Sequence, residues 1–348
     1  MAKAQAVISL LAKLGMPRLL DTYWGKNRLT VLAYHRINDP FSPQFDAYRP
    51  NVSGTPTQFE MQMTWIKRRF NVITLDQCIA ALTSKANLPP RPLLITFDDG
   101  YLDNYTNAYP TLKRLGLPAV IFLMTRGMDD PSPPWWDEVA IYLNKTQKNA
   151  ADLPLIGQTD LSSAELRRNA ADKLLRALKA VTEEEKLAYI AELRATLHMN
   201  EVTADPPLFM NWDQVREVVN NGVACMPHTV THPILTRVTD EEAYRQLRES
   251  KEKIEAETKQ SCTAFAYPNG TTADYSIETI KVLRQLGYQA AFTLTPGPMR
   301  LAEAKKYPFE VKRIFLIYKD SFSLFQMKVM GLPALVERGS FVANTAEN

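Results

Sequence analysis

Short apolar runs alternate with amphipathic segments along most of the chain. Seven of these runs predict buried strands: residues 29–35, 93–98, 118–124, 223–228, 263–267, 288–294 and 311–318. Helical periodicity separates most of them, over residues 58–69, 104–115, 239–257 and 275–286. Strands that alternate with helices predict a parallel α/β sheet, either closed into a barrel or doubly wound. In both architectures, functional groups gather at the carboxyl ends of the strands.

One long segment interrupts this alternation. Residues 135–210 contain a charged, helix-forming stretch that is longer than an ordinary connection between two strands. We interpret residues 138–208, approximately, as a helical insertion, because the alternation of strands and helices continues on both sides of it. The main domain is therefore expected to span residues 29–320, with a closing helix and tail over residues 321–348.

The N-terminal segment, residues 1–28, predicts an amphipathic helix with several leucines on or near one face. It only faintly resembles a secretory signal, because Lys13 and Arg18 interrupt its apolar run and no clean cleavage site follows. No apolar run approaches the roughly 18 residues needed to span a bilayer. We expect a cytoplasmic protein, with this segment packed on the domain or in peripheral contact with a membrane. A periplasmic location is the alternative.

Composition narrows the possible partners. The chain has 348 residues, of which 45% are hydrophobic and 23% charged, so it can bury a sizeable core. Its formal net charge is only +3 and no block of five or more Lys and Arg residues occurs, so no nucleic-acid partner is expected. Cys78, Cys225 and Cys262 are widely spaced, which indicates neither a disulfide framework nor a thiolate zinc site.

Two adjacent carboxylates end the second predicted strand. Asp98 and Asp99 follow the apolar run and precede Gly100. Adjacent side chains on a strand point to opposite sides, but a turn at the glycine lets both face one cavity. A divalent cation there would offset their mutual repulsion. The alternative interpretation is an ordinary helix N-cap or turn signal before the next helix.

A histidine pair supplies a second group with metal-binding chemistry. His228 and His232 occur in PHTVTHP, four residues apart, on the same side of a predicted helical turn. Pairs with this spacing also arise by chance, but the chain has only four histidines. Two imidazoles and one carboxylate, from Asp98 or Asp99, complete a three-ligand site with an open position, as in a catalytic metal centre. Zn²⁺ is the expected metal.

Three motifs resemble those of a known family. Thr96-Phe97-Asp98-Asp99-Gly100, His228-Thr229-Val230-Thr231-His232 and Tyr267-Pro268-Asn269-Gly270 occur in the order typical of NodB-homology polysaccharide deacetylases, carbohydrate esterase family four. WWDEVA and NWDQV further resemble members from bacterial exopolysaccharide and cell-envelope pathways. The resemblance covers roughly residues 29–318 and implies a distorted, TIM-like (β/α)7 barrel with a helical insertion.

The resemblance also implies an activity and residue roles. It implies a hydrolase acting on non-peptide carbon–nitrogen bonds, which removes N-acetyl groups from an amino-sugar-containing glycan or its precursor. Asp98 would be the general base, and Asp99, His228 and His232 the metal ligands. Metal-bound water would attack the amide, leaving acetate and a free amine. Backbone N–H groups near Tyr267 to Gly270 would help to stabilise the oxyanion.

The sequence departs from the family pattern at two charged positions. Ala266 stands where many members carry arginine, and no histidine follows His232, whereas many members have a late catalytic histidine. His35, at the end of the first strand, is therefore the candidate catalytic acid; alternatively it braces Asp98 or hydrogen-bonds in the core. Arg313 is expected to replace the missing charge by pairing with Asp98, the alternative being a rim salt bridge.

Substrate contacts are expected from the third motif and from aromatic side chains. The residues assigned to substrate binding are Tyr267, Pro268, Asn269, Gly270, Trp212 and Arg313. Tyr267 and Trp212 would stack on sugar rings, although core packing is the commoner use of such side chains. Tyr101, Trp135 and Trp136 lie in or near predicted rim loops without an assigned role.

Other functions remain open from the sequence. A deformylase or amidase acting on a lipid- or nucleotide-linked sugar would use the same site, and a catalytically weak member could bind glycan without hydrolysing it. Retention of Asp98 favours an enzyme, because a binding module has no need of a base beside the metal. A haloacid dehalogenase-type phosphatase does not fit, because its two aspartates are separated by one intervening residue, whereas Asp98 and Asp99 are adjacent.

Overall fold

Seven parallel strands form the centre of the molecule. The computed structural model describes residues 28–331, except residues 43, 85 and 205–206. The strands are β1 (Arg28–Tyr34), β5 (Pro92–Asp99), β6 (Ala119–Leu123), β9 (Val223–Pro227), β10 (Ala264–Ala266), β11 (Ala290–Pro296) and β13 (Val311–Phe315). They lie in the order β10-β11-β13-β1-β5-β6-β9. The end strands β9 and β10 contact each other, so the sheet curls into a nearly closed barrel. The predicted distorted (β/α)7 barrel is confirmed, and the doubly wound alternative is wrong.

The strands follow the apolar runs because both of their faces are covered. All eight residues of β5 are buried, and so are all six residues from Leu29 to Tyr34 of β1. A parallel strand that is enclosed on both faces needs a continuous apolar run, not an alternating one. Two short strands extend the sheet, β4 (Asn71–Val72) beside β5 and β12 (Met299–Arg300) beside β1.

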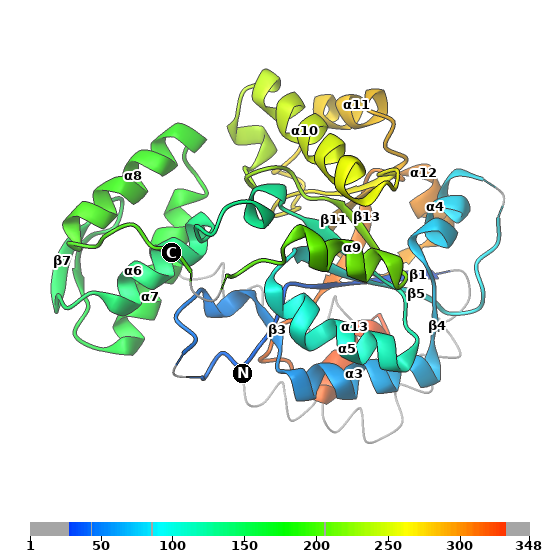
Figure 1. Cartoon of the computed structure of the whole chain (residues 1–348), viewed down its shortest axis with the longest axis horizontal. Coiled ribbons are helices and arrows are strands. Elements are labelled where there is room, and N and C mark those ends of the chain that lie inside the picture. The colour runs from blue at the N-terminus through cyan, green and yellow to red at the C-terminus, as the bar shows by residue number, and fades with distance from the viewer. Residues whose placement is uncertain (1–27, 43, 85, 205–206, 332–348) are drawn as a thin grey trace.

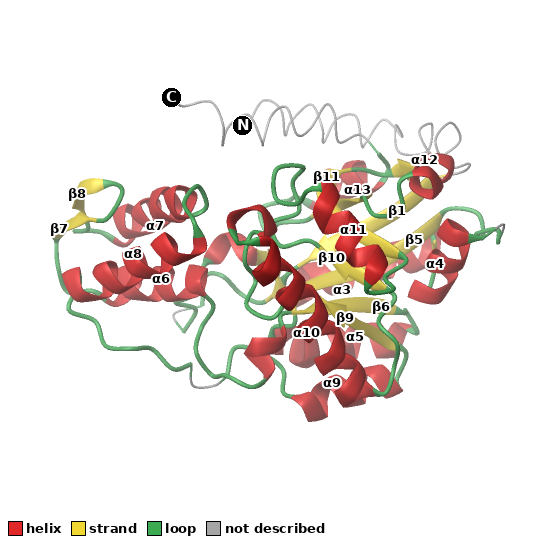
Figure 2. Cartoon of the chain, turned by 90° about the horizontal axis from the view of Figure 1, so that it is seen from above, coloured by secondary structure: helices red, strands yellow, loops and turns green. Residues whose placement is uncertain are grey.

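Helices cover the outside of the barrel (Figure 2). They are α3 (Pro56–Arg69), α4 (Leu75–Thr83), α5 (Tyr109–Leu115), α9 (Trp212–Asn220), α10 (Asp240–Thr258), α11 (Ile277–Gln285), α12 (Leu301–Lys306) and α13 (Phe322–Val329). Capping boxes start several of them; Thr55, for example, accepts a hydrogen bond from the backbone N–H of Gln58, whose side chain accepts from the backbone of Thr55.

The predicted helix over residues 104–115 has two parts. Asn104–Ala108 form a π-helical turn, η2, and only Tyr109–Leu115 form α5. Within η2, the side-chain amides of Asn104 and Asn107 donate to the carbonyls of His35 and Ile37, at 2.7 Å each. The wider turn therefore faces the short strand β2 (Arg36–Ile37), which follows β1. Sequence periodicity does not distinguish a π-helical turn from an α-helix.

The long segment between β6 and β9 forms a lobe beside the barrel (Figure 1). It contains α6 (Trp135–Lys145), α7 (Ala164–Leu178) and α8 (Glu183–Thr196), together with a hairpin of β7 (Ala150–Leu153) and β8 (Gly157–Asp160). The sequence analysis did not predict this hairpin, because its strands are four residues long and β8 has no buried residue.

The two ends of the chain are only partly described. The predicted N-terminal amphipathic segment lies outside the described residues, except for Arg28, which begins β1. Of the predicted closing helix and tail, the described part is α13 with the residues around it. No helix within residues 28–331, apart from their gaps, is both long and apolar enough to cross a bilayer.

A buried ion pair ties α13 to the end of β13. Lys328 Nζ lies 2.9 Å from Asp320 Oδ2, and the two side chains are 7% and 3% exposed. Lys328 also donates to the Phe315 carbonyl, while Asp320 accepts from the backbone N–H of Ile317. The closing helix is thus held by charge as well as by apolar packing.

Replacing Asp320 by alanine should therefore destabilise the fold. Asp320→Ala leaves the Lys328 ammonium buried without its counter-charge, so we expect the free energy of unfolding in urea to fall by about 3 kcal/mol. The double variant Asp320→Asn with Lys328→Met removes both charges and should recover much of this loss. A loss below about 1 kcal/mol for Asp320→Ala would contradict the anchoring role.

Candidate active site and metal centre

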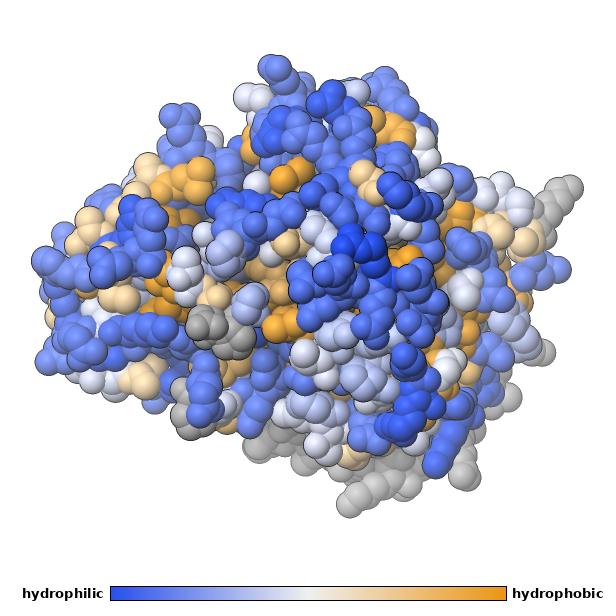
Figure 3. Space-filling model, in the orientation of Figure 1, coloured by the Kyte–Doolittle hydropathy of each residue, from blue (hydrophilic) through white to orange (hydrophobic). Residues whose placement is uncertain are grey.

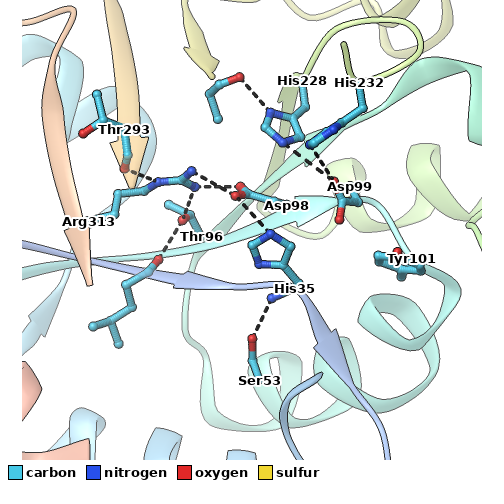
Figure 4. A network of polar contacts seen from close by, with 12 residues as sticks. His35, Ser53, Thr96, Asp98, Asp99, Tyr101, His228, His232, Thr293 and Arg313 are labelled. Atoms are coloured by element: carbon cyan, nitrogen blue, oxygen red, sulfur yellow. Dashed lines mark hydrogen bonds and ion pairs between the residues drawn. The ribbon is translucent and has the colours of Figure 1, made fainter. Parts of the chain in front are cut away.

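The end of β5 directs two carboxylates into the mouth of the barrel (Figure 4). Asp99 has a φ of 73° and Gly100 a φ of 81°, so the chain turns sharply through the left-handed region. Glycine is favoured at position 100 by its φ of 81°, and a Cβ there would also lie 2.7 Å from Leu123 Cδ2. A left-handed aspartate is uncommon, and such strain is typical of functional sites.

Asp98 forms a bidentate ion pair with Arg313. Asp98 Oδ1 lies 2.6 Å from Arg313 Nη1, and Oδ2 lies 2.9 Å from Nη2. Arg313, at 0% exposure, also donates to the Thr293 carbonyl and to Thr96 Oγ1. The expected pairing is therefore present, and the rim salt bridge is not. The assignment of Arg313 to substrate binding is wrong, because its guanidinium is buried and engaged with protein partners.

Arg313 determines the protonation state of Asp98. Burial by itself would raise the pKa of this carboxyl. The positive charge of Arg313, together with its hydrogen bonds, outweighs burial and holds the pKa of Asp98 below its usual value. Asp98 is consequently an ionised, oriented carboxylate that can accept a proton.

Asp99 faces the histidine pair instead. Its Oδ1 lies 3.7 Å from His228 Nε2 and 3.6 Å from His232 Nε2. The three ligand atoms lie within 4.8 Å of one another, and all three residues are buried. This arrangement brings together the predicted metal ligands, with Asp99 and not Asp98 supplying the carboxylate.

A backbone carbonyl fixes the tautomer of His228. Its Nδ1 lies 2.7 Å from the carbonyl oxygen of Ala266 at the end of β10. Because a carbonyl only accepts, Nδ1 carries the proton and the Nε2 lone pair faces Asp99. Orientation of a metal-binding imidazole by a second hydrogen bond is typical of metal sites.

The histidine motif is not helical. Thr229 and His232 have φ values of 68° and 61°, and Thr229 Oγ1 accepts a hydrogen bond from the backbone N–H of His232. The prediction that the pair shares one side of a helical turn is therefore wrong. Two left-handed residues fold the chain back after β9 and bring the imidazole rings to 4.8 Å between their centroids.

The electrostatics of the Asp99 cluster fit a cation. Asp99 Oδ1 is buried and has no hydrogen-bond partner. Burial, then Asp98 and Asp137, raise the pKa of Asp99 well above its usual value, while burial lowers the pKa of both His228 and His232. An unsatisfied carboxylate oxygen beside two neutral imidazoles is a donor set suited to Zn²⁺ or a similar divalent ion.

His35 lies beside Asp98. Its Nε2 is 3.8 Å from Asp98 Oδ2, too far for a direct hydrogen bond, and its Nδ1 has no partner. Burial lowers the pKa of His35 to about 4, although the charge of Asp98 acts in the opposite direction. The imidazole is therefore neutral near pH 7 and borders the same space as the carboxylate.

The aromatic side chains assigned to sugar stacking lie in the core. Tyr267 is fully buried, donates its hydroxyl hydrogen to the Phe309 carbonyl and stacks on Tyr275 at 4.1 Å. Trp212 is 8% exposed, and its indole N–H donates to Asp129. Neither ring is free to cover a sugar, so both assignments are wrong; core packing uses these rings.

The rest of the third motif shapes a turn next to Ala266. Asn269 and Gly270 have φ values of 60° and 70°, and a Cβ on Gly270 would lie 2.7 Å from the backbone nitrogen of Leu294. Pro268 and Gly270 are buried, whereas Asn269 is partly exposed. Substrate binding by these three residues stays a prediction, with Asn269 the most accessible of them.

The lobe contributes residues that the sequence analysis left without a role. The Trp136 ring, from the first turn of α6, lies 4.6 Å from the His232 ring. Its indole N–H donates to the Tyr101 hydroxyl, which donates to Asp137. Asp137 was not predicted at all; its only signal was an acidic residue in the first turn of a helix that follows two tryptophans.

Comparisons with known proteins agree with this geometry. A model of the polysaccharide deacetylase family matches residues 85–149 and 188–291. The putative polysaccharide deacetylase YxkH of Bacillus subtilis is 22% identical over 271 residues, covering 78% of this chain and 66% of YxkH. The poly-beta-1,6-N-acetyl-D-glucosamine N-deacetylase of Staphylococcus epidermidis is 33% identical over 108 residues, covering 29% of this chain and 37% of that enzyme. Each match spans less than two thirds of the relative.

Solved structures share the fold over most of the chain. The Streptococcus pyogenes deacetylase PplD, in complex with acetate, superposes with a TM-score of 0.58 at 18% identity, covering 87% of this chain and 98% of PplD. IcaB from Ammonifex degensii gives a TM-score of 0.54 at 17% identity, covering 88% of this chain and 98% of IcaB. Because the family model spans both the aspartate pair and the histidine pair at the mouth of this barrel, the chain belongs to the polysaccharide deacetylase family.

Proposed function

We propose that this protein is a metal-dependent hydrolase that removes N-acetyl groups from an amino-sugar-containing glycan or its precursor. One observation carries the proposal: the adjacent carboxylates Asp98 and Asp99 have different partners. Asp98 is held ionised by Arg313, and Asp99 faces two neutral imidazoles. A base and a metal ligand on neighbouring residues are the two groups that water-mediated amide hydrolysis requires.

Asp99, His228 and His232 would hold the metal, with Zn²⁺ the simplest candidate. A divalent ion bound there would supply Lewis acidity and lower the pKa of a water molecule. The protein keeps the ligands ready: the Ala266 carbonyl directs His228, and the Trp136 ring lies against His232. Burial of the ligands limits competition from bulk water.

Asp98 would take the proton of the attacking water. The Arg313 fork orients both carboxylate oxygens, so the base needs little rearrangement as the reaction proceeds. The C–N bond of the amide then breaks, and the same proton is delivered to the departing nitrogen, giving acetate and an amine. His35, 3.8 Å from Asp98, would pass this proton on and so serve as the catalytic acid.

The substrate is proposed from the relatives' names. The Staphylococcus epidermidis relative is named for poly-beta-1,6-N-acetyl-D-glucosamine, and it matches this chain over 108 residues. We therefore choose β-1,6-linked N-acetylglucosamine oligomers as first substrates and place the reaction in exopolysaccharide metabolism. Acetate release by the purified, zinc-loaded protein tests this directly.

The adjacent aspartates offer a matched pair of isosteric variants. Asp98→Asn removes the base and should lower the rate of acetate release about 100- to 10,000-fold, while zinc remains bound. Asp99→Asn removes an anionic ligand and should lower the bound zinc as well as the rate. Acetate assays and metal analysis by mass spectrometry distinguish the two. Undiminished turnover by Asp98→Asn, or full zinc content in Asp99→Asn, would sink the assignment.

Arg313 should set the acidic limit of activity. Because Arg313 lowers the pKa of Asp98, its replacement in Arg313→Gln should raise that pKa. Asp98 would then be protonated, and unable to act as a base, up to a higher pH. We expect the acidic limb of the kcat/KM profile to move to higher pH, and Arg313→Lys to move it less. An unshifted limb in Arg313→Gln would show that the ion pair does not tune the base.

A further inference from the structure

We propose that a cavity beside the metal centre binds a second, neutral sugar residue of the N-acetylated glycan, with Arg36 as its anchor. This inference rests on the proposed function, since it concerns the same substrate. It assigns a binding role to a part of the molecule that the deacetylation chemistry does not use.

The cavity has a volume of about 550 Å³. Its walls come from the loop after β2, from η2, from α6 and from residues 202–204 and 207–208. None of Asp98, Asp99, His228 or His232 lines it, so it is distinct from the metal centre. Its volume lies in the range of small-molecule sites and far above that of one ordered water.

Arg36 lines this cavity with unused hydrogen-bonding capacity. It is only 5% exposed, and its Nε donates to Asp103 Oδ2 at 2.8 Å. Its guanidinium carbon lies 4.8 Å from the Phe45 ring and 4.6 Å from the Tyr101 ring, so aromatic rings hold the plane. Its Nη1 is buried without a partner. A buried charged donor left unpaired is costly, and a ligand oxygen would satisfy it.

The charges around the cavity favour a neutral ligand. Arg36 is paired with Asp103, and Lys145 is paired with Asp46 at 2.7 Å. Each cation that lines the cavity therefore already has its carboxylate, and no excess positive charge is left for an anion. A hydroxyl or acetamide oxygen accepts from a guanidinium without adding charge.

The rest of the lining suits a sugar. The Asn38 and Asn107 amides donate to Asp103 and to the Ile37 carbonyl, so these residues present their side-chain oxygens to the cavity. Thr106 adds a hydroxyl group, while Ile141 and Leu208 supply apolar surface. A pyranose has the same combination, with hydroxyls around its edge and C–H groups on its faces. Much of the visible surface between the lobe and the barrel is hydrophilic with interspersed hydrophobic residues (Figure 3).

The cavity and the metal centre share a wall. The Tyr101 ring contacts Arg36 on the cavity side, and its hydroxyl accepts from Trp136, whose ring contacts His232. One layer of aromatic side chains therefore separates the two places. A glycan that occupied both places would pass around this buried layer, and such an oligomer would bind better than a single sugar.

The test measures binding in the zinc-loaded, full-length Asp98→Asn protein, where turnover is suppressed. The probe is a β-1,6-linked N-acetylglucosamine pentamer, titrated by calorimetry. Adding Thr106→Trp fills the cavity from the exposed side of η2 and should weaken binding at least tenfold. Ser162→Trp, an exposed position on the lobe that does not line the cavity, is the matched control and should bind like the parent.

Arg36→Lys provides a second variant with a different mode of action. Lysine keeps a positive charge near Asp103 but lacks the second donor, so we expect binding to weaken about tenfold or more. Thermal melting of each variant shows whether it is folded. If either folded variant, Thr106→Trp or Arg36→Lys, bound the pentamer as tightly as Ser162→Trp does, the cavity would hold only water and the proposal would be wrong.

Two further outcomes complete the test. Cavity-dependent binding of an acidic oligogalacturonate in preference to the pentamer would overturn the neutral ligand, as would absence of pentamer binding by the parent. Acetate release by the wild-type protein is scored separately. If the wild-type protein releases acetate but Thr106→Trp binds the pentamer like Ser162→Trp, only the cavity proposal is rejected. If the wild-type protein releases no acetate but Thr106→Trp loses binding, only the proposed activity is rejected.

Discussion

The structure of the site depends on keeping two neighbouring carboxylates apart in a buried place. Asp98 and Asp99 are each 1% exposed, and each raises the cost of ionising the other. The protein offsets the cost of ionisation for Asp98 only, by pairing this carboxylate with the Arg313 guanidinium. On the other side it leaves Asp99 with an unsatisfied oxygen and two neutral imidazoles. The asymmetry gives chemically identical side chains different roles.

The barrel supplies this asymmetry because distant strands end at one place. Asp98 and Asp99 end β5, Arg313 comes from β13, His228 follows β9, and the carbonyl that orients it ends β10. These strands bring residues more than 200 positions apart into contact without a long loop. Near-closure of the sheet matters for the same reason, since β9 and β10 at its two ends must meet for Ala266 to reach His228.

Much of this arrangement could be predicted from the sequence, and the misses have common causes. The apolar runs predicted the strands, because parallel strands are buried on both faces. The chemistry of the side chains predicted that the aspartates, the histidines and Arg313 lie together. Sequence spacing could not show that His228 to His232 lie on a left-handed turn, since backbone strain is imposed by tertiary packing. Nor could it show that Tyr267 and Trp212 lie in the core, because the sequence does not give the direction in which an aromatic side chain near a motif points. The role of Asp137 could not be predicted, because its hydrogen-bond partners, Tyr101 and Tyr48, are distant in sequence.

The position of Trp136 divides the lobe into a part that contacts the metal-ligand residues and an outer part. The first turn of α6 touches a metal-ligand side chain and Tyr101, so this turn belongs functionally to the barrel. The hairpin and α7 fall within residues 150–187, which the family model leaves unmatched. Sequence drift, insertion or exchange in that outer portion can alter what surrounds the barrel mouth while the support of His232 is inherited unchanged. The lobe is therefore a natural junction for building chimeras, with the graft point after α6.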